Sequence, residues 1–173
     1  LRRARVMVVR EMFRDADGGW QECKPGQDEV AGRLPGIRIL QAEGPLFFGS
    51  AGELMNELDA ALHDPRARVV ILRLKRAQGM DNTVASVLAE AARQAEKQGR
   101  WLMLVALDET QMRVLERSGA AQAFPPEHLL KVRGKRFEAL EIACRLAQEH
   151  LAHGGRVLET VEPPPALQDV TDV

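Results

Sequence analysis

The chain has 173 residues, of which 45% are hydrophobic and 28% are charged, so it can bury the core of one domain. A net charge of −1 and only 4% aromatic residues, with no Tyr, argue against a general nucleic-acid binder. The longest wholly apolar run, Trp101–Leu107, is far shorter than the ~20 residues of a membrane-spanning helix.

The ends of the chain and its cysteines bear on where the protein works. Cys23 and Cys144 have no spacing typical of a metal or redox motif, which indicates a reducing compartment, and no secretory signal opens the chain. Because the first residue is Leu1 rather than Met, we expect a piece of a longer protein. Leu1–Arg14 contains five arginines and one glutamate. This basic start fits either a solvated arm or the cytoplasmic stretch that follows a membrane helix.

Composition divides the chain into three parts. Val6–Val9 is apolar enough for a short strand, but Asp15–Gly36 is dense in glycine and proline and predicts a loop or linker. We therefore expect residues 1–36 to be a juxtamembrane arm and linker, and residues 37–153 to be the compact domain. Residues 154–173, with three consecutive prolines and an acidic excess, predict a flexible tail.

Strands and helices alternate within the expected domain. In chain order we expect strands at 37–43 and 46–48, a helix capped by Ser50 and ended by Asp64-Pro65, a strand at 69–72, a helix at 81–98, a strand at 101–107, a helix at 108–118, a strand at 128–132 and a helix at 134–150. Gly44-Pro45 would make the first two strands antiparallel, whereas Val69–Leu72 is typical of a buried parallel strand.

This order predicts an α/β fold: a mixed, mainly parallel sheet with an antiparallel first strand pair, covered by about four helices. The residues expected in its core are Ile39, Phe47, Leu58, Val70, Leu72, Leu88, Leu102, Leu104 and Leu140.

Catalytic templates are missing from the sequence. It contains no phosphate-binding or dinucleotide-binding glycine motif and no nucleophile elbow. His150 and His153 have helical i, i+3 spacing, but we interpret them as exposed residues favoured by the negative end of a helix rather than as metal ligands. Cys144 lies on an apolar helical stripe and is expected to be a small core residue. We therefore expect no enzyme, no metal and no cofactor.

The turn formed by Met80, Asp81, Asn82 and Thr83 is the candidate site, because it joins a buried strand to a clean helix. Asp81 is placed to cap the helix, with Thr83 in the first turn. The first-turn amides would tolerate an anion, and a phosphate on Thr83 would gain from the helix dipole while meeting repulsion from Asp81. The turn is therefore a possible phospho-acceptor or anion-binding site.

Four motifs in order resemble the STAS domain of SulP-type (sulfate permease family) anion transporters. They are Gly44–Ala51, Val69–Leu74, Met80–Thr83 and Leu115–Gly119, within a resemblance that runs from Ile37 to about Leu151. Leu1–Arg3 also resembles the segment that follows the last membrane helix of that family.

The resemblance implies a non-catalytic regulatory and protein-interaction domain at the cytoplasmic face of the inner or plasma membrane. Its partners would be the membrane domain of the same transporter, a regulatory protein, and a second copy through the full-length transporter, with no nucleic acid. The transported anion would be sulfate, bicarbonate or a related anion.

Two alternatives remain open. Anti-sigma-factor antagonists share the STAS fold and carry Asp-Ser-Ser-Gly before the same helix, with the second Ser phosphorylated; Thr83 occupies that position. Asn82 and Val84 replace the first Ser and the Gly, which resembles the transporter branch more closely. The α/β order alone would also permit a small enzyme or nucleotide-binding protein.

Overall fold

The computed structural model describes residues 6–27 and 32–154. The strands are β1 (Val8–Arg14), β2 (Trp20–Cys23), β3 (Ile37–Pro45), β4 (Val69–Arg73), β5 (Ala77–Gln78), β6 (Trp101–Leu107) and β7 (Leu129–Lys131). The helices are α1 (Phe48–Leu62), α2 (Asn82–Lys97), α3 (Glu109–Arg117) and α4 (Glu138–Ala152), with short 3-10 helices η1 (Ala120–Ala123) and η2 (Pro126–His128).

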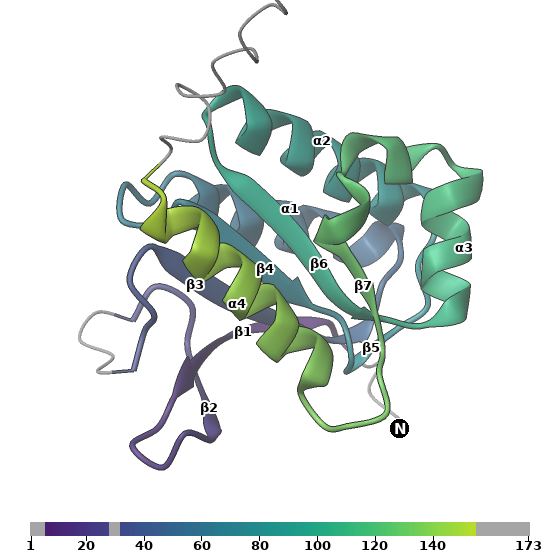
Figure 1. Cartoon of the computed structure of the whole chain (residues 1–173). Coiled ribbons are helices and arrows are strands. Elements are labelled where there is room, and N and C mark those ends of the chain that lie inside the picture. Colours follow the sequence, from purple (N-terminus) through teal and green to yellow (C-terminus); the bar gives the residue numbers. More distant parts are fainter. Residues whose placement is uncertain (1–5, 28–31, 155–173) are drawn as a thin grey trace, which may run out of the picture.

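The strands form one mixed sheet in the order β2-β1-β3-β4-β6-β7, with β5 paired to the end of β3 (Figure 1). β1 runs antiparallel to both β2 and β3, while β3, β4, β6 and β7 are parallel. The predicted fold class, mixed and mainly parallel with an antiparallel part, is confirmed.

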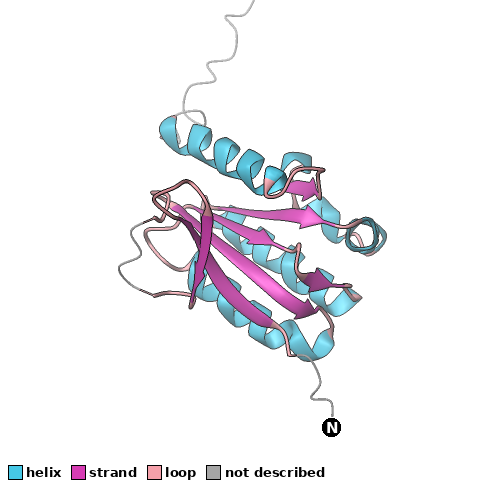
Figure 2. Ribbon diagram, turned by 90° about the horizontal axis from the view of Figure 1, so that it is seen from below, coloured by secondary structure: helices cyan, strands magenta, loops and turns pink. Residues whose placement is uncertain are grey.

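Helices cover both faces of the sheet, and Figure 2 shows the sheet between α4 on one side and the other helices on the other. Because successive side chains of a strand point to opposite faces, each strand contributes to two cores. Leu40, Leu72 and Leu104 pack on the side of α1 and α2, with Leu54 and Leu58 of α1.

The second core lies under α4. Ile39, Ile71 and Met103 pack there against Leu140 and Cys144. All the residues expected in the core are buried except Phe47. Burial raises the pKa of the Cys144 thiol to about 12, which fits its predicted role as a small core residue.

The sheet begins well before the expected domain start at Ile37. β1 lies between β2 and β3, and together with the preceding Met7 it supplies both cores: Met7 and Val9 on one face, Met12 on the other. Asp15–Gly36, expected as a loop or linker, contains β2. The segment expected as an arm and linker therefore contributes two strands to the sheet and three side chains to its cores. The expected tail lies almost entirely outside the described residues.

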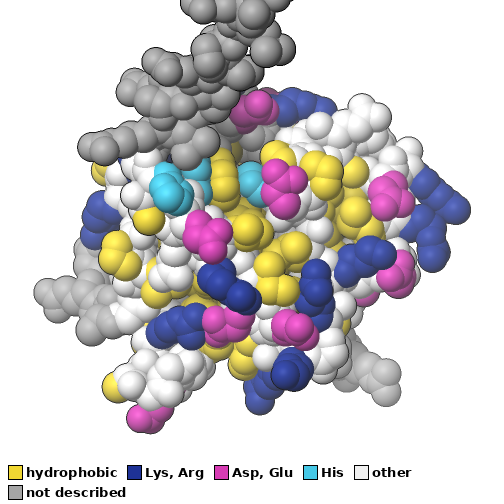
Figure 3. All heavy atoms as spheres, in the orientation of Figure 1, with side chains coloured by type: hydrophobic (Ala, Val, Ile, Leu, Met, Phe, Trp, Pro, Cys, Tyr) yellow, Lys and Arg dark blue, Asp and Glu magenta, His cyan; other side chains and the backbone are white. Residues whose placement is uncertain are grey.

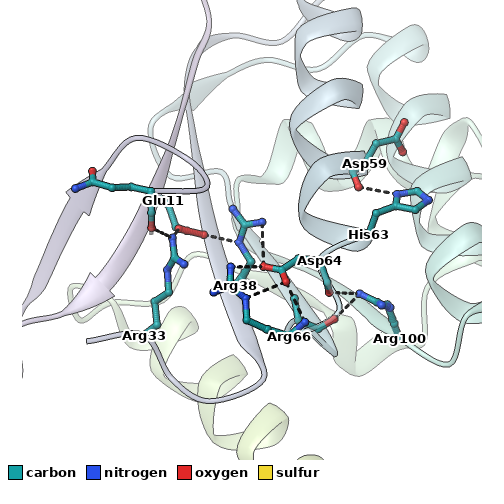
Figure 4. A network of polar contacts seen from close by, with 10 residues as sticks. Glu11, Arg33, Arg38, Asp59, His63, Asp64, Arg66 and Arg100 are labelled. Atoms are coloured by element: carbon teal, nitrogen blue, oxygen red, sulfur yellow. Dashed lines mark hydrogen bonds and ion pairs between the residues drawn. The ribbon is translucent and has the colours of Figure 1, made fainter. Parts of the chain in front are cut away.

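A buried ion network fastens β1 to the rest of the molecule (Figure 4). Glu11 of β1 is fully buried and accepts hydrogen bonds from Arg33 and, at 2.5 Å, from Arg38 Nε of β3. Arg38 Nη1 also lies 3.7 Å from Asp64 Oδ2, in the turn that follows α1. A buried carboxylate between two guanidinium groups stabilises a fold only while its partners stay in place. The network therefore makes β1 integral to the domain.

The prediction of a strand at Leu46–Phe48 is wrong. The chain passes from β3 directly into α1, so the antiparallel partner of β3 is β1 rather than a following strand. Phe47 is 41% exposed, outside the core. Gly44 has a φ of +101°, and a Cβ there would lie 3.2 Å from Met7 Cα, so this position requires glycine where β1 and β3 approach closely.

Ser50 stabilises the start of α1 from inside the helix rather than as its first cap. The helix begins at Phe48, and the Ser50 hydroxyl accepts a hydrogen bond from Phe47 N at 3.0 Å. The side chain thus reaches back from the third helical position, as the second residue of a capping box does.

Candidate functional site

Asp81 lies where the first turns of α1 and α2 meet. Its Oδ1 accepts a hydrogen bond from Val84 N at 2.9 Å, which caps α2 as predicted. Its Oδ2 accepts a second bond from Phe48 N at 2.7 Å, at the start of α1. One carboxylate therefore satisfies unpaired amides of two helices.

The other three residues of the predicted site differ in exposure. Asn82 and Thr83 are exposed, and Thr83 lies in the first turn of α2, as the sequence predicted. Met80 is only 7% exposed and belongs to the core beneath α1 and α2. A partner can thus touch Asn82 and Thr83, whereas Met80 supports the turn from below.

Gln111 holds this turn from α3, and the sequence analysis missed it. Its buried side chain donates from Nε2 to Gly79 O at 3.2 Å, just before Met80. Its Oε1 also accepts from Asp108 N at 3.0 Å, while Asp108 Oδ1 accepts from Gln111 N at 2.7 Å. This reciprocal capping box has the spacing Asp-x-x-Gln, a signal present in the sequence.

Exposed apolar side chains border the Asp81 turn. Val6 is 77% exposed, Phe48 73%, Val8 42% and Phe47 41%; we call these four residues the Phe48 surface. Val6, Val8 and Phe47 line a hollow of about 450 Å³, and the Phe48 ring meets that of Phe47 edge-on at 5.4 Å. Apolar groups gathered in this way mark an interaction surface more often than scattered ones do.

The electrostatics of the turn favour a contact over a tightly bound anion. The first-turn amides of α1 and α2 carry partial positive charge, but the Asp81 carboxylate already accepts from one amide of each helix. An added anion or a phosphate on Thr83 would meet this negative charge at close range. The turn can accept a hydrogen-bonding partner at Asn82 and Thr83 beside the Phe48 surface.

His128 and His150 pack against Trp101 in an aromatic cluster that shares no residue with this turn. His150 was expected to be exposed, but its ring stacks on Trp101 at 3.8 Å, and the buried His128 ring lies 4.4 Å from the same indole. Burial lowers the pKa of both His128 and His150. His153 is exposed, as expected. In the described parts of the chain, no cluster of His, Cys, Asp or Glu is arranged to hold a metal ion.

Comparison with known families identifies the fold. The STAS domain model matches residues 30–134, which is more than half of the chain. The chain belongs to the STAS domain family. A search of the curated proteins finds no significant match.

Solved STAS structures come from both branches of the family. A sulfate transporter family protein from Wolinella succinogenes is 25% identical, with a TM-score of 0.58, and the match covers 75% of this chain and 99% of that one. The murine anion transporter Slc26a9 is 16% identical, with a TM-score of 0.64 over 82% of this chain. The unphosphorylated anti-sigma factor antagonist SpoIIAA is 13% identical, with a TM-score of 0.50 over 69% of this chain and 96% of its own. The last two likenesses show the fold alone.

This STAS domain corresponds to only part of the transporter in that comparison, because the match covers 22% of the Slc26a9 chain. Within the described residues, no helix combines the length and the apolar character needed to cross a membrane. STAS domains are regulatory or interaction domains, which agrees with the predicted class of function.

Proposed function

We propose that this STAS domain is the cytoplasmic regulatory and interaction domain of a SulP-family secondary anion transporter. The observation that carries the proposal is the Phe48 surface next to the Asp81 turn. Four exposed apolar side chains there adjoin two exposed polar residues, Asn82 and Thr83. The 25% identity to a sulfate transporter family protein, across nearly the whole of that chain, supports the transporter branch.

In this proposal the Phe48 surface docks on the membrane domain of the same transporter. Val6 and Val8 belong to the surface, so the contact would include the start of β1. The apolar rings would lose water on docking, while Thr83 would lie at the rim, where polar residues surround an apolar centre. Movement at this contact would then alter transport of sulfate, bicarbonate or a related anion.

The same face could instead bind a regulatory protein. In a dimer of the full-length transporter, a second copy of this STAS domain would also lie nearby. Neither arrangement requires catalysis by the domain. No nucleic acid is expected as a partner, since the chain has a net charge of −1.

Exposure of Thr83 favours a second candidate, a free-standing phosphorylation switch like an anti-sigma-factor antagonist. Thr83 lies in the first turn of α2, where a kinase could reach its hydroxyl. The Asp81 carboxylate would repel the added phosphate, which suits a change of surface more than a change of fold. Incubation with ATP and an anti-sigma-type serine kinase would support this candidate if a phosphoryl group appears on Thr83 in wild type but not in Thr83→Ala.

Anion uptake by the full-length protein tests the leading proposal. We expect Thr83→Glu and Phe48→Ser to change the rate of sulfate or bicarbonate uptake at normal expression, and Thr83→Ala to behave nearly as wild type. Ser86→Glu, which places the same charge on an exposed position one turn along α2, should leave uptake unchanged. Unchanged uptake in both Thr83→Glu and Phe48→Ser would contradict the proposal.

A further inference from the structure

Arg73 is a buried cation without a carboxylate partner among the described residues. It ends β4 on the α4 face of the sheet and is only 6% exposed. Its Nη1 donates to Gln41 Oε1 on the neighbouring strand, and its Nε has no hydrogen-bond partner within the described parts of the chain. Burying a guanidinium group with an unused donor is costly unless a counter-charge is present.

The carboxylate of Glu22 acts on Arg73, but it is already bonded to other side chains. Gln41 stands between Arg73 and Glu22, since its Nε2 donates to Glu22 Oε1. Glu22 also lies 3.7 Å from Arg10 Nε. The amide of Gln41 thus separates Arg73 from this carboxylate, and the free donor of Arg73 is left for another acceptor.

Further cations surround Arg73. A hollow of about 360 Å³ opens beside it, lined by the end of β4 and by the loop that joins β7 to α4. We call it the basic hollow; its charged lining residues are Arg73, Lys75, Arg133, Lys135, Arg136 and Glu138. The single carboxylate among them accepts from Lys135 N at 3.2 Å. Figure 3 shows Lys and Arg side chains gathered on the lower half of the molecule in this view, with acidic side chains between them.

Phe137 brings two of these cations together. Its ring faces the guanidinium carbon of Arg73 at 4.6 Å and that of Arg136 at 4.9 Å. Burial lowers the pKa of Arg73, and the charges of Arg76 and Arg136 lower it further. Phe137 and Ala106, with φ of 63° and 58°, are the two non-glycine residues of positive φ in the described chain, and both line this hollow. Backbone strain of this kind gathers at functional sites.

We propose that the basic hollow binds a tetrahedral oxyanion of the sulfate or phosphate class, free or carried on a larger molecule, with Arg73 as the buried anchor. A planar guanidinium group offers two parallel donors that match the oxygens of such an anion. Arg133 and Lys135 are exposed on the loop and supply charge from the open side. The site lies on the opposite face of the sheet from α1 and α2, and the proposal does not depend on the transporter role.

Calorimetric titration of the 173-residue chain tests the site with sodium sulfate, sodium phosphate and sodium chloride at constant ionic strength. Heat of binding is measured rather than melting temperature, because sulfate stabilises most proteins by exclusion from their surface. We expect saturable binding of sulfate and phosphate and none of chloride. The double variant Arg133→Gln/Lys135→Gln changes exposed residues only, and should weaken binding about tenfold or more.

Arg73→Gln should weaken binding at least as strongly, with a melting curve to show that it folds. Arg113→Gln, an exposed arginine on α3, is the matched control and should bind as wild type. Vesicles of phosphatidylcholine with and without phosphatidylglycerol identify the source of the oxyanion: binding to anionic vesicles that requires Arg133 and Lys135 supports a lipid phosphate. The proposal is overturned if no oxyanion binds in either arm, or if the control loses as much binding as the double variant.

Discussion

The two oxygens of the Asp81 carboxylate fasten the first turns of two helices. Asp81→Ala would remove the acceptor for Val84 N and for Phe48 N together. We expect the free energy of unfolding to fall by about 1–3 kcal/mol, since a lost helix cap costs about 1 kcal/mol and a second amide loses its partner. Urea unfolding of the isolated domain measures this change. Asn82→Ala, at the exposed neighbouring position, should stay within about 0.5 kcal/mol of wild type, and an equal loss there would contradict the role given to Asp81.

His128 makes stability depend on pH. Burial lowers its pKa in the folded state below the ordinary value of 6.5, so the unfolded chain binds the proton more readily. The neutral His128 side chain therefore leaves the free energy of unfolding at its full value above pH 6.5. That free energy falls as the pH drops below 6.5 and the unfolded chain takes up the proton first. The pKa of His150, on the other side of Trp101, shifts in the same direction. We expect the urea midpoint to fall between pH 7.5 and 5.5, less steeply in His128→Gln than in wild type. If the exposed His153→Gln variant weakened the pH dependence of the urea midpoint as much as His128→Gln does, the effect would come from surface charge rather than from burial of His128.

At the scale of elements, β1 stabilises the domain through its buried ion network and its side chains in both cores. Glu11→Ala would remove the carboxylate that accepts from both Arg33 and Arg38, and would leave the buried Arg38 with only the more distant Asp64 at 3.7 Å. We expect a loss of about 3–5 kcal/mol in the free energy of unfolding, because removing one partner of a buried ion pair leaves the other charge poorly compensated.

Glu109→Ala is the control for β1, because Glu109 pairs with Lys131 at the surface and should cost no more than about 1 kcal/mol. Deleting residues 1–14 should be more damaging than either substitution, since Met7, Val9 and Met12 leave the two cores. A truncated chain that melts within a few degrees of wild type would show that β1 is dispensable, as a solvated arm would be.

Most of the elements were predictable because their residues carry periodic or continuous apolar patterns. β4, β6 and α2 lie within a residue or two of their expected bounds. The apolar start of β1 was predictable as a short strand, but β2 and the place of both strands in the sheet were not, because β1 pairs with β3 and β2 with β1 across a glycine-rich segment. Phe47 was expected in a short strand after the Gly44-Pro45 bend, whereas here the buried Leu46 is followed by the start of α1.

The candidate site was predictable in part. Asp81 and Thr83 are residue types that indicate the start of a helix, so their local geometry follows from residue types and spacing. The second bond of Asp81 to Phe48 N, and the support from Gln111, require the packing of α1 and α3 against the turn. The basic hollow is built from the end of β4 and the loop before α4, which only the folded sheet brings together.

At the scale of the whole molecule, two surfaces of different chemistry lie beyond the carboxyl ends of the parallel strands. The Asp81 turn, Phe47 and Phe48 lie at the starts of α1 and α2, and the basic hollow lies on the side of α4. This edge is where sheets of this kind commonly carry function. The residues that line the basic hollow are not among those of the Phe48 surface, so docking and anion binding would use different side chains.

Thiol labelling at Phe48→Cys tests the docking proposal most directly. Cys144 is buried with a pKa raised to about 12 and should not react, and half-buried Cys23 is replaced by Ser. In the isolated domain, Phe48→Cys should be labelled quickly, because Phe48 is 73% exposed. In the full-length protein we expect labelling slower by roughly tenfold or more, while Arg93→Cys on the exposed side of α2 reacts equally in both. Equal labelling of Phe48→Cys in the isolated domain and in the full-length protein would contradict docking through this surface.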